Sequence, residues 1–294
     1  MTVLNVGSIN WDRVLRIPRF PAPGETLQAR STEVGLGGKG LNQTVAIARA
    51  GGAVRHVGAV GANDQGVRGA LSRLGVDLSR IVGIDGCETG SATILVDDAG
   101  ENLIVLDPGA NRRIPDALVA RAVGECAGGD WLLIQNETNQ AGDCARLARA
   151  QGMRVALSAA PFVAEVVVPL LDTVDLLSVN AVELQQLTEA LGGEHRLPVG
   201  LSLLVTRGAE GAEYIAGGRT MRVSAHRVSV VDTTGAGDVF LGVFLAELDR
   251  DRPAASALAR ASAAAAVQVG RTGAVGAIPT RAEAEAMLKA AQEP

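Results

Sequence analysis

Short apolar segments alternate with stretches of helical periodicity along most of this chain of 294 residues. Val- and Leu-rich runs bounded by turn residues predict buried strands, and strands that alternate with helices favour βαβ units. We therefore expect an α/β fold with a mostly parallel sheet and helices on both faces. Strands are predicted at 3–8, 54–60, 131–135, 154–158, 176–179 and 202–206, and helices at 42–50, 64–74, 115–123, 140–151, 182–191, 239–249, 254–269 and 281–291.

Two stretches interrupt this alternation. Residues 12–34 carry three prolines between extended segments, and residues 89–106 have the pattern of a β-hairpin with its turn at 97–100. They are either ordinary surface loops or a small β-layer that covers one end of the sheet as a lid. We favour the lid, and we expect residues 1–294 to form a single α/β domain that carries both insertions.

Composition excludes several classes of function. The chain is 47% hydrophobic, enough for a large core, and its net charge is −5 without any basic block, which argues against a nucleic-acid partner. No apolar run approaches the ~20 residues of a membrane span, and a strand-like segment begins at residue 3. We therefore expect a cytoplasmic protein without a membrane partner. Three cysteines and three histidines are too scattered for a disulfide framework or a metal cluster.

Residues 232–238 read Asp-Thr-Thr-Gly-Ala-Gly-Asp and lead directly into an apolar run at 239–245. This pattern predicts a loop that opens a helix, where unpaired N–H groups and the helix dipole favour an anion. The small residues Gly235, Ala236 and Gly237 let a phosphate approach the backbone closely. Asp238 is then either a helix cap or a base that takes a proton from the group attacking the phosphate.

Further polar residues follow the predicted strands, at the edge where open α/β sheets bind ligands. Asn10 and Asp12 alternate to the same side of an extended chain and could grip two neighbouring hydroxyls. The Gly-rich segment 35–43 places Lys39 at a helix start, and it is not a Walker A loop because Gly40 follows the lysine. This segment is a flexible turn or a contact for a polyhydroxylated ligand.

Three later strands also end in polar residues. Gln135-Asn136-Glu137 follows one of them, and Thr206 and Gly208 follow another. Asn180 and Glu183, three residues apart at a helix start, have the spacing of a capping box. The other possibility is that this pair holds waters around Mg²⁺, which keeps several waters in most of its protein sites.

Along nearly its whole length the chain resembles the ribokinase-like (PfkB-type) carbohydrate kinase family. The motifs Gly37-Gly38-Lys39-Gly40-Leu41-Asn42-Gln43 and Asp232–Asp238 carry the resemblance, and segments 7–12, 23–26, 100–102 and 108–111 are similar to those of its ribose-specific members. The family implies a three-layer αβα fold with a β-sheet lid. It also implies ATP-dependent transfer of the γ-phosphoryl group to a primary hydroxyl, with D-ribose converted to D-ribose 5-phosphate. The alternatives are another sugar, a nucleoside, or a non-catalytic sugar-binding relative.

The resemblance also implies roles for individual residues. Asp238 would be the catalytic base, and the amides of Gly235, Ala236 and Gly237 would form the anion hole. Mg²⁺ would be organised through water by Asn180 and Glu183. The sugar would be bound by Asn10, Asp12, Gly38, Lys39, Asn42, Glu137 and Asp238, and the nucleotide by Asn180, Thr206 and Gly208.

A monovalent cation and a second subunit are two further implications of the resemblance. The lid often pairs two subunits in relatives, which implies a homodimer. Ala277 stands where relatives usually offer a serine hydroxyl, so K⁺ would be bound with one ligand fewer. The implied K⁺ ligands are Asp232, Thr234, Gln268, Arg271, Gly273 and Ala277.

Overall fold

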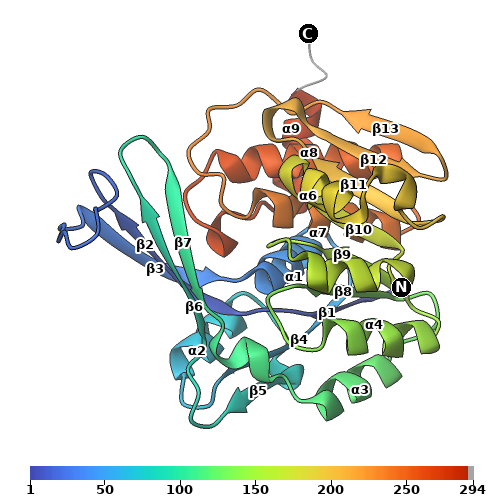
Figure 1. Ribbon diagram of the computed structural model, residues 1–294, viewed down its shortest axis with the longest axis horizontal. Helices are drawn as coiled ribbons and strands as arrows, with labels where there is room; N and C mark the ends of the chain where they lie inside the picture. Colours follow the sequence, from blue (N-terminus) through green and yellow to red (C-terminus); the bar gives the residue numbers. More distant parts are fainter. Residues whose placement is uncertain (291–294) are drawn as a thin grey trace.

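The computed structural model describes residues 1–290, so the predicted end of the last helix at residue 291 lies outside the described part of the chain. Nine strands form the main sheet in the order β13-β12-β11-β10-β9-β8-β1-β4-β5 (Figure 1). The strands from β11 to β5 run parallel, which confirms the predicted sheet. Their bounds are β1 (Val3–Val6), β4 (Val54–Gly61), β5 (Ile81–Ile84), β8 (Trp131–Gln135), β9 (Arg154–Ser158), β10 (Leu176–Asn180), β11 (Ser202–Thr206), β12 (Ala212–Ala216) and β13 (Arg219–Val223).

The helices cover both faces of this sheet, as predicted. One apolar cluster packs α1, α2, α7, α8 and α9 on one face, and a second packs α3, α4, α5 and α6 on the other. Alternate strand residues supply the two clusters, because successive side chains of a strand point to opposite faces. The helices are α1 (Lys39–Arg49), α2 (Gln65–Arg73), α3 (Asp116–Gly124), α4 (Ala141–Ala150), α5 (Ala164–Val167), α6 (Ala181–Leu191), α7 (Ala236–Asp249), α8 (Ala254–Val269) and α9 (Arg281–Ala290).

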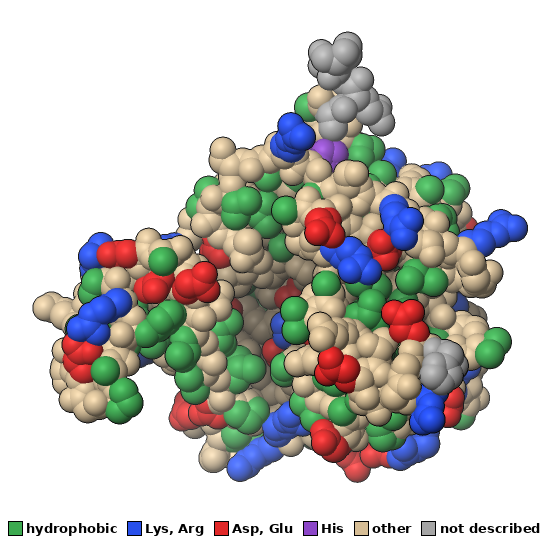
Figure 2. Space-filling model, turned by 45° about the horizontal axis from the view of Figure 1, so that its top comes forward, with side chains coloured by type: hydrophobic (Ala, Val, Ile, Leu, Met, Phe, Trp, Pro, Cys, Tyr) green, Lys and Arg blue, Asp and Glu red, His purple; other side chains and the backbone are tan. Residues whose placement is uncertain are grey.

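A separate four-stranded sheet confirms the predicted β-layer. Its order is β3-β2-β6-β7, in which β2 and β6 are parallel and the other two pairs are antiparallel. Figure 1 shows this small sheet projecting from one end of the main body, and Figure 2 shows a hollow between the two with charged side chains at its floor. The strands are β2 (Asn10–Arg16), β3 (Ser31–Gly37), β6 (Gly90–Val96) and β7 (Asn102–Asp107).

Several predicted boundaries were wrong, with consequences for the site. The first strand ends at Val6 rather than at residue 8, because the chain leaves the main sheet there and begins β2 at Asn10. Helices α1 and α7 each begin three residues earlier than predicted, at Lys39 and Ala236. Strands β5, β12 and β13 and the single helical turn α5 were not predicted from the sequence. The missed strands are short and near the sheet edges, so they lack a long apolar run.

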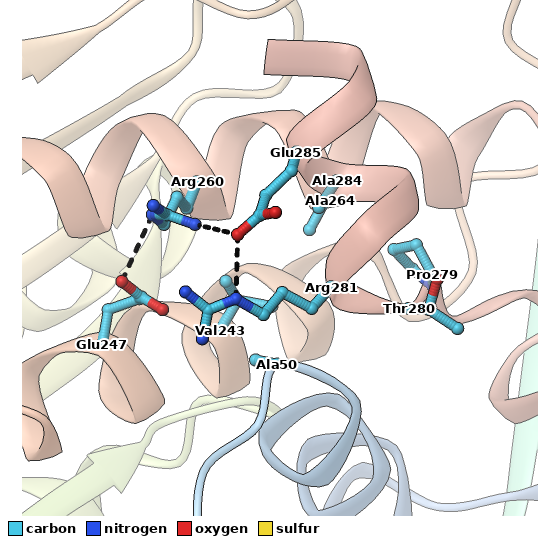
Figure 3. Close-up of a pocket in the computed structure, with 10 residues that line it drawn as sticks. All are labelled: Ala50, Val243, Glu247, Arg260, Ala264, Pro279, Thr280, Arg281, Ala284 and Glu285. Atoms are coloured by element: carbon cyan, nitrogen blue, oxygen red, sulfur yellow. Dashed lines mark hydrogen bonds and ion pairs between the residues drawn. The ribbon is translucent and has the colours of Figure 1, made fainter. Parts of the chain in front are cut away.

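The far end of α7 is tied to α8 and α9 by charged side chains (Figure 3). Glu247 is almost fully buried, and its Oε2 lies 3.3 Å from Nε of Arg260. Arg260 and Arg281 each lie 2.8 Å from Oε1 of Glu285. These pairs border a cavity of about 20 Å³, room for one water molecule. The network fixes the helix layer behind the sheet rather than forming part of the candidate site.

None of the helices within residues 1–290 is long and apolar enough to cross a membrane. Cys87, Cys126 and Cys144 are unpaired in the described chain. Among the described residues, no three His, Cys, Asp or Glu side chains are grouped so that they could hold a metal ion.

Candidate active site

Residues from distant parts of the sequence meet at the carboxyl ends of the parallel strands. Side-chain hydrogen bonds join Ser8 to Glu137 and Asn42 to Asp238, the latter across 196 positions of sequence. Parallel strands place their carboxyl ends at one edge of the sheet, so the loops after β1, β8, β10 and β11 share this edge. The N-termini of α1 and α7 lie at the same edge.

Asp238 lies in the first turn of α7 and is only 8% exposed. Its Oδ2 accepts a hydrogen bond from Nδ2 of Asn42 at 2.9 Å, and its Oδ1 accepts one from Nε2 of Gln43 at 2.8 Å. Asp238 makes no side-chain hydrogen bond to its own helix start, where Gly235 is the N-cap. Two N–H donors on the two oxygens match the ionised form of the carboxyl group.

A chain of buried amides fixes the orientation of Gln43. The carbonyl of Gly40 can only accept, so Asn5 must present Nδ2 to it at 2.7 Å and keep Oδ1 as an acceptor. Gln135 then donates from Nε2 to Asn5 Oδ1 at 2.9 Å and to Gln43 Oε1 at 2.7 Å. Gln43 is left with its N–H₂ directed at Asp238. Because Asn5, Gln43 and Gln135 are fully buried, water cannot compete for these bonds.

Glu137 holds the start of α1 against the end of β1. Its Oε2 accepts from Oγ of Ser8 at 2.5 Å and from the backbone N–H of Lys39 at 3.2 Å. Gly40 packs directly on the chain at Gly7 and Ser8: a Cβ at Gly40 would lie 2.3 Å from the Ser8 nitrogen. Gly38, the N-cap residue of α1, has φ 92°, which side-chain-bearing residues rarely adopt. These contacts explain why the Gly-rich segment precedes this helix.

Asp12 extends from β2 into the same cluster of charges. A Cβ at Gly37 would lie 1.9 Å from Asp12 Oδ2, so a glycine is required beside this carboxyl group. Burial, together with the nearby carboxylates of Glu137 and Asp238, raises the pKa of Asp12 to about 7 against the opposing charge of Lys39. Asp12 Oδ1 is buried without a hydrogen-bond partner among the described residues.

Lys39 is the cation of this cluster. Burial lowers the pKa of its ammonium group, but the carboxylates of Asp238, Glu137, Glu183 and Asp12 outweigh that cost and raise it. Lys39 is therefore charged at neutral pH and lies among the predicted sugar-binding residues.

Asn10 is held in place by a residue that the sequence analysis did not select. Its Oδ1 accepts from Nδ2 of Asn111 at 2.7 Å, and Asn111 Oδ1 accepts from the backbone N–H of Ile9 at 2.9 Å. Asn111 is 1% exposed. The Asn10 amide therefore presents its NH₂ group away from Asn111, available to a ligand.

The predicted anion loop has the expected shape, with one difference. Gly235 is the N-cap of α7 at φ 72°, a left-handed conformation that glycine adopts without strain. The backbone N–H of Ala236 donates to the carbonyl of Thr233 at 3.2 Å. Within residues 1–290 the N–H groups of Gly235, Gly237 and Asp238 have no hydrogen-bond partner. The free donors at this helix start are therefore at 235, 237 and 238.

Asn180 and Glu183 form the capping box that their spacing indicates. Asn180 Oδ1 accepts from the Glu183 N–H, and Glu183 Oε2 accepts from the Asn180 N–H, both at 2.8 Å. Asn180 is solvent-exposed and Glu183 is half-buried at the start of α6. Thr206 ends β11, and Gly208 follows with φ 55° in a short 3-10 turn at the same sheet edge.

The loop before α7 packs against the loop that follows α8. Asp232 Oδ1 accepts from the Thr234 N–H at 2.9 Å and from its hydroxyl at 2.6 Å, and Oδ2 accepts from the Gly273 N–H at 2.9 Å. Burial alone would raise the pKa of Asp232. The hydrogen bonds from Thr234 and Gly273 have the larger combined effect, so the pKa of Asp232 is lowered. Arg271 lies beside the carbonyl of Ala277 at 3.5 Å. All six residues implied as K⁺ ligands therefore lie in or beside these two loops.

Four site residues were not predicted from the sequence: Ser8, Gln43, Asn111 and Gln135. All four lie in segments noted in the sequence: Ser8 in 7–12, Gln43 in 37–43, Asn111 in 108–111 and Gln135 at the end of the predicted strand 131–135. A buried amide has no periodicity of its own, so only the position of its partners reveals its role.

Known proteins with the same architecture define the class. A family model described as pfkB family carbohydrate kinase matches residues 2–281. A ribokinase from Haemophilus influenzae is 33% identical, and the match covers 96% of each chain. The crystal structure of a ribokinase from Cryptococcus neoformans in complex with ADP has a TM-score of 0.85 at 28% identity, covering 97% of this chain and 98% of that one. A ribokinase from Arabidopsis thaliana complexed with ribose and ATP has a TM-score of 0.81 at 28% identity, covering 98% of both chains.

The fold and the site thus define a phosphotransferase that uses an alcohol group as acceptor. The chain belongs to the pfkB family of carbohydrate kinases.

Proposed function

We propose that this protein transfers the γ-phosphoryl group of ATP to the primary hydroxyl of D-ribose and so forms D-ribose 5-phosphate. The observation that carries this proposal is the pairing of Asp238, held as an acceptor at both oxygens, with free backbone donors at 235, 237 and 238. Ribose as the acceptor rests on the ribokinases of similar sequence and on the ribose complex of the Arabidopsis thaliana enzyme.

Asp238 would accept the proton of the attacking hydroxyl. A positioned base contributes typically ~10²–10⁴-fold to such a reaction. The free N–H groups of Gly235 and Gly237 would stabilise charge that develops on the transferring phosphoryl group, and in-line alignment supplies the rest. The N–H of Ala236 would join them only by exchanging its bond to Thr233 for one to the phosphate.

The sugar would lie in the hollow between the small sheet and the main body. Asn10 and Asp12 would contact it from β2, and Lys39, Asn42 and Glu137 would contact it from the main body. Gly38 would contact the polyol through its backbone. Hydroxyl groups would supply a partner for the unpaired Oδ1 of Asp12, which is what a sugar pocket requires.

ATP would lie over Thr206, Gly208 and the start of α6. Glu183 Oε2 and Asn180 Oδ1 serve the capping box, so one carboxylate oxygen and one amide N–H₂ are free of it. The free carboxylate oxygen of Glu183 fits Mg²⁺ held mainly by phosphates and waters, because it would accept from the waters, and the N–H₂ group of Asn180 would donate to a phosphate oxygen. When bound, Mg²⁺ would neutralise phosphate charge.

A homodimer through the small sheet and a cytoplasmic location complete the proposal. Support for the dimer comes from one face of the small sheet, where Val34 and Val105 are 58% and 60% exposed. Exposed apolar side chains grouped on one sheet face are typical of an interaction surface.

The decisive experiment measures sugar-dependent ADP release by the purified protein across pentoses, hexoses and nucleosides. We expect the highest kcat/KM with D-ribose. A higher value with another sugar or a nucleoside replaces ribose in the proposal. No ADP release with any acceptor overturns the kinase proposal and leaves a sugar-binding protein.

A variant of Asp238 tests the assigned base. We expect Asp238→Asn to lower kcat by ~10²–10⁴-fold. The new amide faces the donors of Asn42 and Gln43, so retention of the fold is checked by thermal unfolding and by binding of ATP. Asp116→Asn, at the exposed start of α3, is the matched control with unchanged kcat. A folded Asp238→Asn enzyme with wild-type kcat contradicts the assignment.

A further inference from the structure

We propose that the side-chain amide of Gln268 takes the place of a monovalent cation beside the anion loop, so that this protein needs no K⁺. The inference concerns how residues 232–235 are held in position. It rests on the proposed function only for its activity readout, since the stability readout below requires no catalysis.

Three backbone carbonyl groups converge on one nitrogen atom. Nε2 of Gln268 lies 2.9 Å from the carbonyl oxygen of Thr234, 3.1 Å from that of Gly273 and 3.2 Å from that of Ala274. Gln268 is fully buried. Several carbonyl oxygens around one point are the surroundings in which proteins bind K⁺. Here a neutral amide already lies at that point.

The orientation of this amide is determined by its neighbours. Rotating the group by half a turn would place Oε1 against three carbonyl oxygens, all of which are acceptors only. The observed orientation leaves Oε1 buried without a hydrogen-bond partner among the described residues. An unpaired buried acceptor is unfavourable, so the contact of the N–H₂ group with the carbonyl cluster must be the stronger effect.

A K⁺ ion does not fit this arrangement while Gln268 is present. Thr234 and Gly273 are two of the residues that the family resemblance implies as K⁺ ligands, and their carbonyl groups are bonded to the amide. Ala277 offers no hydroxyl, and its carbonyl faces Arg271, whose guanidinium group also pairs with Glu283. The amide N–H₂ group has two hydrogens for three carbonyl oxygens. The three oxygens therefore share its partial positive charge, much as they would share the charge of a bound ion.

The amide also links the two loops that an ion would join. Thr234 belongs to the segment that leads into α7, and Gly273 and Ala274 belong to the loop after α8. Asp232 adds a second link through the N–H of Gly273. The free donors at residues 235 and 237 are therefore held in place by side chains, and their position does not depend on the ionic composition of the solution.

Thermal unfolding in KCl, NaCl and choline chloride at equal ionic strength tests this inference. We expect the wild-type protein to have the same Tm in all three salts. Gln268→Ala removes the amide and leaves room for an ion, so KCl should raise its Tm by about 2–4 °C above choline chloride. Gln268→Met keeps the side-chain volume without a donor and should show no K⁺-specific shift.

Sugar kinase activity under the same salts gives the second readout. The wild type should be equally active in all three salts. Gln268→Ala should lose at least tenfold in activity in choline chloride and recover most of that activity in KCl, whereas Gln268→Met should not recover.

A K⁺-specific rise in Tm of the wild type overturns the inference even if no variant folds. A folded Gln268→Ala protein without any K⁺-specific Tm shift also overturns it. If no acceptor supports ADP release, the proposed function fails while the Tm result still decides this inference.

Discussion

At the scale of single residues, the candidate site depends on buried amide groups that hold the Asp238 carboxylate through hydrogen bonds. Asp238 accepts from Asn42 and Gln43, and the orientation of Gln43 depends on Gln135. None of these amides carries a charge. They therefore orient the Asp238 carboxylate through the direction of their hydrogen bonds rather than through charge–charge attraction. Removing one member should therefore change the position of the carboxylate more than the affinity for ligands.

Gln135→Leu removes the donor that holds Oε1 of Gln43. Without it the Gln43 amide can turn its oxygen toward Asp238, which repels the carboxylate. We expect kcat to fall about tenfold, equal to about 1.4 kcal/mol, with little change in the KM for sugar, and the pH profile of kcat to shift. Steady-state kinetics across pH measure both.

Leu147→Ala, on the exposed surface of α4, is a control for that experiment. Equal falls in kcat and sugar affinity, or an unshifted pH profile, would mean that Gln135 has only a structural role.

Asp12 makes the stability of the free protein dependent on pH. Its pKa is about 7 in the folded state against an ordinary 3.8, so the folded protein holds this proton more tightly than the unfolded chain does. Stability therefore falls as pH rises from about 4 to 7, by up to about 4 kcal/mol, and the loss persists at higher pH.

Asp12→Asn removes this penalty. Urea unfolding should show the variant more stable than wild type at pH 8, with a much smaller difference at pH 4. Asp107→Asn, on exposed β7, should show no such dependence. The same stability difference at both pH values would refute the raised pKa.

At the scale of elements, the site depends on the close approach of α1 and α7. These helices carry Asn42, Gln43 and Asp238, and they are in contact at Gly242, one turn after Asp238. A Cβ at Gly242 would lie 2.6 Å from the Cβ of Ala46 and 3.0 Å from the Gln43 carbonyl oxygen. The packing of the two helices requires a glycine at this position, because any side chain would hold α1 and α7 farther apart.

Gly242→Ala should push α1 and α7 apart. Overpacking costs ~1–3 kcal/mol, and the better helix propensity of alanine offsets about 1 kcal/mol, so we expect a net loss of up to about 2 kcal/mol. The kcat should fall as well, because the displacement moves Gln43 relative to Asp238. Chemical unfolding and steady-state kinetics measure the two effects.

Ala46→Gly added to Gly242→Ala removes one of the two clashing methyl groups. Part of the activity should return in the double variant. Ala46→Gly alone controls for its own cost in helix propensity. A fully stable Gly242→Ala protein would show that the interface adjusts freely.

At the scale of the whole molecule, the small sheet is the part that is least covered by the rest of the chain. Every residue of β7 is exposed, including four large apolar side chains, Leu103, Ile104, Val105 and Leu106. Leu103 and Val105 lie on the same sheet face as Val34, while Ile104 lies on the other face with Ile94. An uncovered β-edge of this kind invites pairing with a second chain.

Light scattering tests whether this face joins two subunits. We expect a wild-type dimer, and a monomer when Leu103 and Val105 are both changed to Lys. Ile104→Lys, on the opposite face of the same strand, is the control that should remain dimeric. A monomeric wild-type protein at working concentration contradicts the proposed homodimer.

Sequence patterns alone predicted the parallel sheet, the helices on both faces, the small β-layer and the loops that carry polar residues. Hydrophobic periodicity and glycine spacing are local, so they can be read along the chain. The same local pattern placed Asp238, Asn42 and Lys39 at helix starts and identified the capping box of Asn180 and Glu183.

The contacts among these residues could be known from the folded chain alone. The roles of Gln43, Gln135 and Asn111, the raised pKa of Asp12 and the amide of Gln268 inside a carbonyl cluster all depend on contacts between segments distant in sequence. Hydrogen bonds and desolvation act over a few ångströms, so their effects are determined when packing brings these groups together. The motif at 232–238 indicated an anion site, and the fold showed that its free donors start at Gly235 and that a glutamine side chain holds the loop.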